Sequence, residues 1–256
     1  MCLILFAQGM HPDWPLILAA NRDEFHARST APASFWTDHP QVLAGRDLQA
    51  GGTWMGITRG GRFAAVTNFA EVPPDPLPPR SRGDLVADFL TGSRSAPEYL
   101  ASITEIGEEF RGFNLVLGHA GELWSCSNRG DGPHRLAAGT YGLSNHLLDT
   151  AWPRVNRGKS ALADFERAEQ TPSITQLLDL LGDETEPRDE ELLHLHPEAQ
   201  GPGARAPCFI RGRDYGTRSS TVVLVHRSGR VQFSEQRFGP DGVVGARDDY
   251  SFDIDA

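Results

Sequence analysis

The chain begins Met1-Cys2-Leu-Ile-Leu-Phe-Ala7, and a second apolar run, Leu16-Ile-Leu-Ala-Ala20, follows a turn that contains two prolines. Apolar runs of this length, separated by a turn, are typical of buried strands, so we expect a hairpin at the start of the chain. Asn21-Arg22-Asp23-Glu24 directly follows the second run. In an antiparallel hairpin the end of the second strand lies beside the start of the first. Arg22 and Asp23 are therefore predicted to lie close to Cys2.

The same turn-and-run pattern predicts three further hairpins, 53–58 with 63–67, 113–117 with 123–127, and 221–226 with 231–236. Apolar residues at helical spacing predict four helices, around 85–90, 99–106, 162–165 and 174–181. Hairpins with helices inserted in groups favour the α+β class, with packed antiparallel sheets and helices outside. The absence of an internal repeat or low-complexity block in 256 residues predicts a single domain, 1–256.

Two segments differ in composition from the rest. Residues 71–79 contain five prolines, which indicates an extended, exposed loop. The loop is either a plain connector or a wall beside a site, because it closely follows Asn68. Acidic residues gather at 183–191 and in the C-terminal tail 248–256. We expect both to be solvated surface or a loose terminus, with an acidic interaction tail as the alternative.

The composition excludes several classes of function. A net charge of −10 argues against a nucleic-acid-binding surface, which needs clustered Lys and Arg. Three cysteines without a CxxC pair favour a reduced, cytoplasmic setting. The apolar stretch Leu3–Ala7 is too short for a signal peptide, and we expect no stable membrane insertion. The expected partner is a small-molecule substrate or ligand, with no cofactor and no metal ion, and nothing in the sequence indicates the oligomeric state.

Cys2 is the candidate reactive residue. Removal of the initiator methionine is expected before a small residue, and it would leave Cys2 with a thiol and a free α-amine. These groups ordinarily titrate near 8.5 and 7.7–8.0, so one residue could supply both nucleophile and base. Arg22 would favour the thiolate and a neighbouring carboxylate would orient the ammonium group. The alternatives are a cysteine that only fills the core and a charged turn held by a local salt bridge.

Longer motifs then connect the chain to a known family. They are Met1-Cys-Leu-Ile-Leu-Phe6, Asn21-Arg-Asp-Glu-Phe25, Ala44-Gly-Arg-Asp-Leu48, Gly51-Gly-Thr-Trp-Met-Gly56, Val66-Thr-Asn-Phe69, Ser81-Arg-Gly-Asp-Leu85, Phe113-Asn-Leu115, Gly142-Leu-Ser-Asn145 and Thr217-Arg-Ser-Ser-Thr221. With these motifs the sequence resembles the NRDE family, which includes the eukaryotic transport and Golgi organisation 2 proteins. The resemblance covers nearly the whole chain.

The NRDE family is in turn similar to the choloylglycine-hydrolase and penicillin-acylase branch of the N-terminal-nucleophile (Ntn) hydrolases. This similarity implies a four-layer αββα fold and cleavage of linear amide bonds. It also implies six site residues, Cys2, Arg22, Asp23, Asn68, Asn145 and Arg218. One feature departs from that branch, where two residues separate the arginine from the aspartate. Because adjacent side chains on a strand point to opposite faces, either Asp23 or Glu24 could take the carboxylate role.

Two functions follow from the resemblance and the chemistry. The first is an amidohydrolase or acyltransferase in which Cys2 attacks the carbonyl carbon and its own amine accepts the proton. Asn68 or Asn145 would donate to the oxyanion, while the other holds the α-amine, and Arg218 would support the site or bind a substrate carboxylate. The second is a non-catalytic binding or trafficking protein for haem or a lipid. Cys2 or a histidine would then ligate haem iron, although no CxxCH motif is present.

Overall fold

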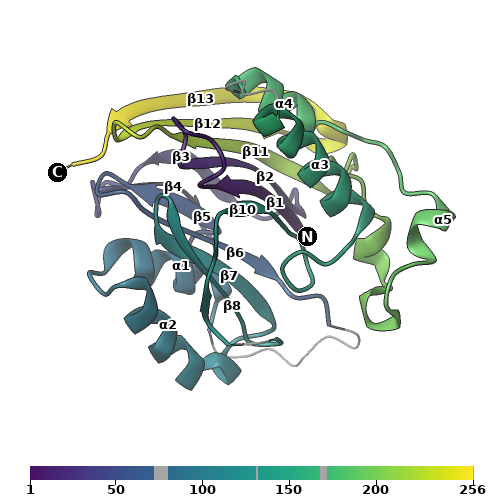
Figure 1. Ribbon diagram of the computed structural model, residues 1–256, viewed down its shortest axis with the longest axis horizontal. Coiled ribbons are helices and arrows are strands. Elements are labelled where there is room, and N and C mark those ends of the chain that lie inside the picture. Colours follow the sequence, from purple (N-terminus) through teal and green to yellow (C-terminus); the bar gives the residue numbers. More distant parts are fainter. Residues whose placement is uncertain (72–79, 131, 168–171, 256) are drawn as a thin grey trace.

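A computed structural model describes residues 1–71, 80–130, 132–167 and 172–255. It confirms the predicted α+β class: two antiparallel sheets pack face to face, and helices cover the outer face of each (Figure 1). The layers follow the order α-β-β-α. The proline-rich loop predicted at 71–79 lies almost wholly outside the described residues.

The first sheet has the strand order β10-β1-β2-β11-β12-β13. Its strands are β1 (Cys2–Gln8), β2 (Leu16–Phe25), β10 (Gly139–Leu143), β11 (Tyr215–Val225), β12 (Arg230–Phe238) and β13 (Val244–Asp253). The second sheet has the order β3-β4-β5-β6-β7-β8-β9. Its strands are β3 (Thr30–Phe35), β4 (Val42–Asp47), β5 (Met55–Thr58), β6 (Arg62–Asn68), β7 (Phe113–His119), β8 (Glu122–Ser127) and β9 (His134–Arg135).

The helices are α1 (Arg82–Thr91), α2 (Ala96–Glu105), α3 (Pro153–Arg167), α4 (Ile174–Leu181) and the short α5 (Asp189–Leu192). Three-residue and four-residue 3-10 turns occur at Gly107–Glu109, Pro197–Ala199, Pro202–Arg205 and Pro240–Gly242. Helices α1 and α2 cover the seven-stranded sheet, and α3 and α4 cover the six-stranded sheet. All four predicted hairpins and all four predicted helices are present.

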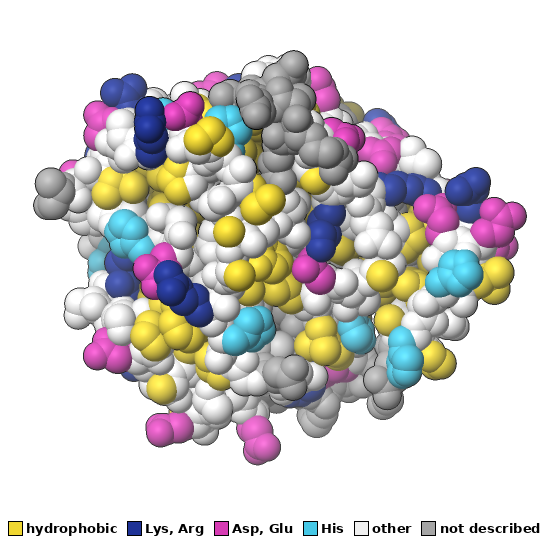
Figure 2. Space-filling view, in the orientation of Figure 1, with side chains coloured by type: hydrophobic (Ala, Val, Ile, Leu, Met, Phe, Trp, Pro, Cys, Tyr) yellow, Lys and Arg dark blue, Asp and Glu magenta, His cyan; other side chains and the backbone are white. Residues whose placement is uncertain are grey.

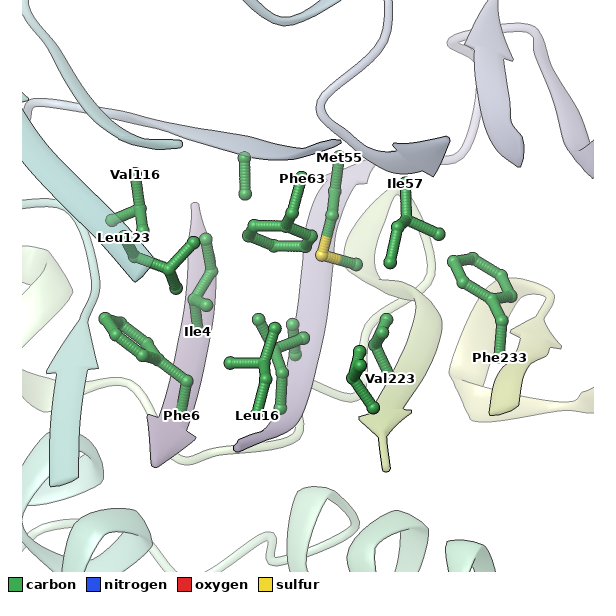
Figure 3. Packing of buried hydrophobic residues seen from close by; sticks show 14 of the residues in the cluster. Ile4, Phe6, Leu16, Met55, Ile57, Phe63, Val116, Leu123, Val223 and Phe233 are labelled. Carbon is green, nitrogen blue, oxygen red and sulfur yellow. The ribbon is translucent and has the colours of Figure 1, made fainter. Parts of the chain in front are cut away.

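Side-chain alternation along the strands divides the core into three layers. Ile4 and Phe6 of β1 point into the space between the sheets, where they meet Phe63 and Val116 (Figure 3). Leu3 and Leu5 of the same strand point the other way, toward α3 and α4. Because a strand has a period of two, the strands β1, β2 and β11 of the first sheet each serve two cores at once. This explains why the apolar runs of these three strands are continuous in the sequence rather than alternating.

The structure decides between the two interpretations of the acidic C-terminal segment, which is a mostly solvent-exposed strand. Residues 248–253 belong to β13, which pairs with β12 along its length, so the acidic tail is not a loose terminus. Salt bridges bring its carboxylates to arginines of β12, including Arg237–Asp248 at 3.2 Å and Arg230–Asp253 at 2.6 Å. The acidic segment is therefore compensated by basic residues that are distant in the sequence.

Charged side chains of both signs lie on the surface of the molecule. On the face seen in Figure 2, basic and acidic side chains are interspersed among hydrophobic and uncharged ones. Within the described part of the chain, none of the helices combines the length and the apolarity needed to cross a bilayer.

One buried ion pair joins α3 to the first sheet. The Nη2 atom of Arg154 lies 2.9 Å from Oδ2 of Asp23, and neither side chain has exposed surface. The other carboxylate oxygen of Asp23 accepts a hydrogen bond from the Thr217 hydroxyl at 2.8 Å. Burial of two charges is costly unless each has its partner, so removing either one leaves an uncompensated charge in the interior.

We therefore predict that Arg154→Met lowers the free energy of unfolding by about 3–5 kcal/mol, because it leaves the Asp23 carboxylate buried without its cation. The matched change Arg157→Met, on the same helix, removes a partly exposed pair with Glu191 and should cost less than about 1 kcal/mol. Urea unfolding monitored by circular dichroism measures both.

The double variant with Asp23→Asn should recover part of the loss, because the remaining buried group is then neutral. Equal losses for Arg154→Met and Arg157→Met would contradict the prediction.

Candidate functional site

Cys2 and Arg22 lie directly opposite each other in the β1–β2 ladder, as the hairpin argument predicts. Alternation puts both side chains on the face that looks between the sheets. There they line a cavity of about 360 Å³, together with Glu24 from the same face of β2. The end of β6 supplies Asn68 to the same cavity. The thiol thus faces a space large enough for part of a small molecule.

The backbone nitrogen of Cys2 has a specific partner. It donates to Oδ1 of Asn145 at 3.0 Å, and Nδ2 of Asn145 donates to the Asn68 carbonyl oxygen at 2.9 Å. Ser144 donates to the Cys2 carbonyl oxygen at 2.9 Å. Ser144 and Asn145, just after β10, therefore hold the start of the chain through the carbonyl oxygen and the nitrogen of Cys2. The Asn145 side chain is almost fully buried at this position.

Met1 is present in the structure, and its ammonium group is held on the other side of Cys2. This group donates to the Asp23 carbonyl oxygen at 2.9 Å and to the hydroxyl of Tyr215. The amide of Asp23 donates in turn to the Met1 carbonyl oxygen at 2.9 Å. Cleavage after Met1 would leave the Cys2 nitrogen as the terminal amine, beside Asn145.

The two candidate carboxylates lie on opposite faces of β2. Asp23 points toward the helices, where Arg154 and Thr217 hold its carboxylate oxygens. Glu24 lies on the Cys2 face, with its Oε2 atom 3.9 Å from Arg22. The Asp23 carboxylate thus supports the strand from behind, and the Glu24 carboxylate is the one that shares the thiol's side.

Arg218 lines a cavity that neighbours the one lined by Cys2. It lies at a β-bulge between Thr217 and Ser219, and its guanidinium donates to the carbonyl oxygens of Phe25 and Arg28 at 2.9 and 2.8 Å. Its side chain lines a neighbouring cavity of about 260 Å³. Arg22 lines both cavities, so Arg218 belongs to the same region without reaching the Cys2 cavity.

Burial and the neighbouring charges set the pKa of the Cys2 thiol. Burial raises this pKa above its ordinary value and the Asp23 charge acts in the same direction, while the N-terminal ammonium and the Arg22 guanidinium lower it. The net upward direction means that the thiol is mainly protonated near neutral pH. Nucleophilic attack from this state needs a base that accepts the proton.

The sequence assigned no role to two groups of residues near the site. Ser144 and Thr217, which lie within the quoted motifs, contact Cys2 and Asp23, and Arg154 and Tyr215, which lie outside those motifs, contact Asp23. The cavity is also rich in arginine, with Arg22, Arg28, Arg46, Arg80, Arg82 and Arg111 in its lining. Of these, only Arg22 is a predicted site residue, while Arg46 and Arg82 lie within the quoted motifs. Arg46 lies in β4 and pairs with Asp38 at 2.8 Å.

No metal centre is apparent in the described ranges, which contain no cluster of three or more His, Cys, Asp and Glu side chains suited to an ion. The arrangement instead offers a thiol, a chain nitrogen within hydrogen-bonding distance of an amide oxygen, and several cations. Such a set can support nucleophilic attack on an acyl group.

Two solved structures share this architecture. The N-acylethanolamine-hydrolyzing acid amidase ortholog of Caenorhabditis elegans aligns with a TM-score of 0.50 and 11% identity, over 87% of this chain and 92% of that one. The C2A mutant of conjugated bile acid hydrolase from Clostridium perfringens aligns with a TM-score of 0.54 and 8% identity, over 99% and 92%. At such identities the likeness concerns the fold alone, and the chain has the Ntn-hydrolase fold predicted from its motifs.

Sequence relatives specify the family. Residues 1–240 match the model of the family Transport and Golgi organisation 2. The Transport and Golgi organization protein 2 homologs of Bos taurus and Homo sapiens are 38% and 36% identical, with 92% of both chains covered in each case. The Drosophila melanogaster protein is 28% identical over the same shares. The motifs, the fold and these relatives agree, and the chain belongs to the Transport and Golgi organisation 2 family.

Proposed function

We propose that removal of Met1 makes this chain an N-terminal-cysteine hydrolase or acyltransferase that acts on a linear amide C–N bond of a small molecule. The observation that carries the proposal is the position of Cys2. Its side chain lines the cavity, while its nitrogen lies 3.0 Å from Oδ1 of Asn145. Cys2 would then supply both the nucleophile, its thiol in the cavity, and the base, its α-amine beside Asn145.

The chemistry would proceed in two stages. The Cys2 sulfur attacks the amide carbonyl carbon, and the thiol proton passes to the α-amine. Breakage of the C–N bond then releases an amine that takes up this proton, which leaves a thioester on Cys2. Water, deprotonated by the α-amine, attacks the thioester and releases a carboxylic acid with the free thiol. In acyl transfer, a second nucleophile replaces water.

The hydrogen bonds favour different tasks for the two asparagines. Asn145 contacts the Cys2 nitrogen and is buried, so we assign it to hold the α-amine in position. Asn68 is exposed to the cavity beside the thiol, so its side-chain amide is our choice for the donor to the oxyanion. Arg22 would counter the effect of burial on the thiol, and Arg218 would support Arg22 from the neighbouring cavity.

The binding alternative would use the same cavity without turnover. The names of the family's relatives refer to transport, which keeps a haem-related or lipid-related trafficking role as the competing proposal. A cytoplasmic location belongs to the proposal as well, supported by three cysteines that form no disulfide. The decisive difference between the two roles is covalent acylation of Cys2.

The first experiment is intact mass spectrometry of the protein after incubation with a panel of N-acyl amides and activated acyl esters. We expect the species without Met1 to gain one acyl group on Cys2, and we expect Cys2→Ala to gain none. Cys126→Ala is the matched control, because that thiol is buried among core side chains. Acylation or turnover that persists in Cys2→Ala would overturn the proposal. Saturable ligand binding with no acylation would favour the trafficking role.

The oxyanion assignment predicts a second result. Asn68→Ala should lower kcat about 10²- to 10³-fold with a smaller change in KM, because the lost hydrogen bond forms mainly in the transition state. Asn156→Ala on the surface of α3 is the control and should leave kcat unchanged. A rise in KM alone would assign Asn68 to substrate binding instead.

The role of Arg22 predicts a change in pH dependence. Alkylation requires the thiolate, so the rate at Cys2 should be low at neutral pH and rise as the pH passes the raised pKa. Arg22→Met removes a group that lowers this pKa, so the whole profile should move to higher pH. The rate at neutral pH should fall about tenfold for each pH unit by which the profile moves, because the thiolate fraction falls in the same proportion. The rate of iodoacetamide labelling between pH 6 and 10 measures this movement. An unchanged profile would show that the guanidinium does not act on the thiol.

A further inference from the structure

The charge of the Cys2 cavity is opposite to that of the whole chain. The chain carries a net charge of −10, yet six arginines line the cavity beside the carboxylates of only Glu24 and Asp47, because the Asp23 carboxylate points toward the helices. Three of the arginines have carboxylate partners within 4 Å, in the pairs Arg28–Asp47, Arg46–Asp38 and Arg80–Asp88. Arg22 has Glu24 at 3.9 Å. The excess positive charge is therefore carried by the remaining two arginines.

Arg82 and Arg111 have no carboxylate within ion-pair distance in the described part of the chain. Arg82 donates from Nη1 to the Gly112 carbonyl oxygen at 3.0 Å. The Nε atom of Arg111 is buried and has no hydrogen-bond partner. Glu71, which borders the same space, is already paired with Arg129 at 2.7 Å. Both side chains are half-buried, and guanidinium groups withdrawn from water normally have hydrogen-bond partners, so two neighbouring ones without an anion indicate a site built for one.

The two guanidinium groups also act on each other. Burial lowers the pKa of Arg82, and the positive charge of Arg111 lowers it further. Two cations held together at the edge of a cavity repel each other, and an oxyanion between them would relieve this repulsion.

The fold holds Arg82 rigidly at this place. It is the first residue of α1, whose N-terminus is capped by the Ser81 hydroxyl, 3.2 Å from the Gly83 nitrogen. A Cβ atom on Gly52 would lie 2.5 Å from the Gly83 carbonyl carbon, so only glycine allows the loop before β5 to approach the helix this closely. The positive end of the α1 dipole therefore faces the cavity wall and adds to the attraction for an anion.

A third hollow, of about 200 Å³, connects these arginines with the chain terminus. Arg82, Arg111 and Asn68 line both this hollow and the Cys2 cavity, and Met1 and Asn145 are also part of the wall of the hollow. Loss of Met1 would enlarge the space between the Cys2 nitrogen and the two guanidinium groups. A substrate that reaches Cys2 could then extend an anionic group toward them.

We propose that Arg82 and Arg111 form an oxyanion-binding subsite that selects substrates carrying a carboxylate or phosphate group beside the scissile amide. The proposal rests on the proposed function, because it names the substrate class of that site. Neutral amides of the same size would bind more weakly. Bidentate contacts from two arginines would orient the substrate as well as attract it.

The test compares two thiol reagents of similar shape and different charge, iodoacetate and iodoacetamide. The ratio of their labelling rates at Cys2, read by peptide mass spectrometry, should exceed the ratio for the same thiol in urea-unfolded protein about tenfold or more. Arg111→Met and Arg82→Met should lower the ratio toward the unfolded value, and added NaCl should lower it in the wild type. Arg135→Met, which removes a surface arginine paired with Glu122, is the matched control and should change nothing. A wild-type ratio equal to that of the unfolded chain would overturn the subsite.

A second measurement does not depend on the reactivity of Cys2 or on the folding of a variant. Phenylglyoxal modifies accessible arginines, and mapping the adducts in the wild-type protein shows which ones an anion protects. Inorganic phosphate or acetate should protect Arg82 and Arg111 but not Arg135, compared with NaCl at equal ionic strength. Protection by phosphate alone assigns a phosphate-bearing substrate, and protection by acetate assigns a carboxylate.

The two proposals can fail separately. Absence of labelling at Cys2 by both reagents, with arginine protection intact, would remove the nucleophile and keep the anion subsite. Normal labelling at Cys2 without arginine protection would keep the nucleophile and overturn the subsite.

Discussion

The register between β1 and β2 is the constraint on which the site depends. It sets Cys2 opposite Arg22, and the two-residue period of the strands then decides the direction of every neighbouring side chain. A slip of β1 by one residue would turn Cys2 toward the helices and away from the face that carries Arg22. The register is strongly specified because both faces of these strands are buried, so that a slipped strand would bring polar side chains into two cores.

The same alternation separates two kinds of electrostatic environment. Behind the sheet, Asp23 and Arg154 form a fully buried pair whose charges cancel, and this pair ties α3 to β2. In front of it, arginines from several strands, loops and the start of α1 surround the cavity without enough carboxylates to balance them. The paired charges behind the sheet stabilise the fold, while the excess positive charge around the cavity is available to bind a ligand. A single strand thus carries residues with structural and functional roles in alternate positions.

For this family, a shared fold does not by itself establish a shared reaction. The two Ntn-hydrolase structures align over most of the chain at 8–11% identity, which establishes the layers and their order. The chemistry proposed for Cys2 rests instead on local contacts, above all the hydrogen bond between its nitrogen and Asn145. Burial raises the pKa of the thiol, which suits a mechanism in which the base acts during attack rather than one with a preformed thiolate.

The sequence by itself determined the local elements and the pairing that brings Arg22 to Cys2, because apolar periodicity and turn residues act over short distances. It also placed Cys2, Asn68 and Asn145 in one site, through motifs that carry a family resemblance. Only the tertiary structure decided which way Asp23 points, since Arg154 and Thr217 come from elements far along the chain. The same holds for the acidic C-terminal strand and for the convergence of Arg82 and Arg111, neither of which has a local signal. Long-range packing brings such residues together, and no pattern within a short window of sequence records it.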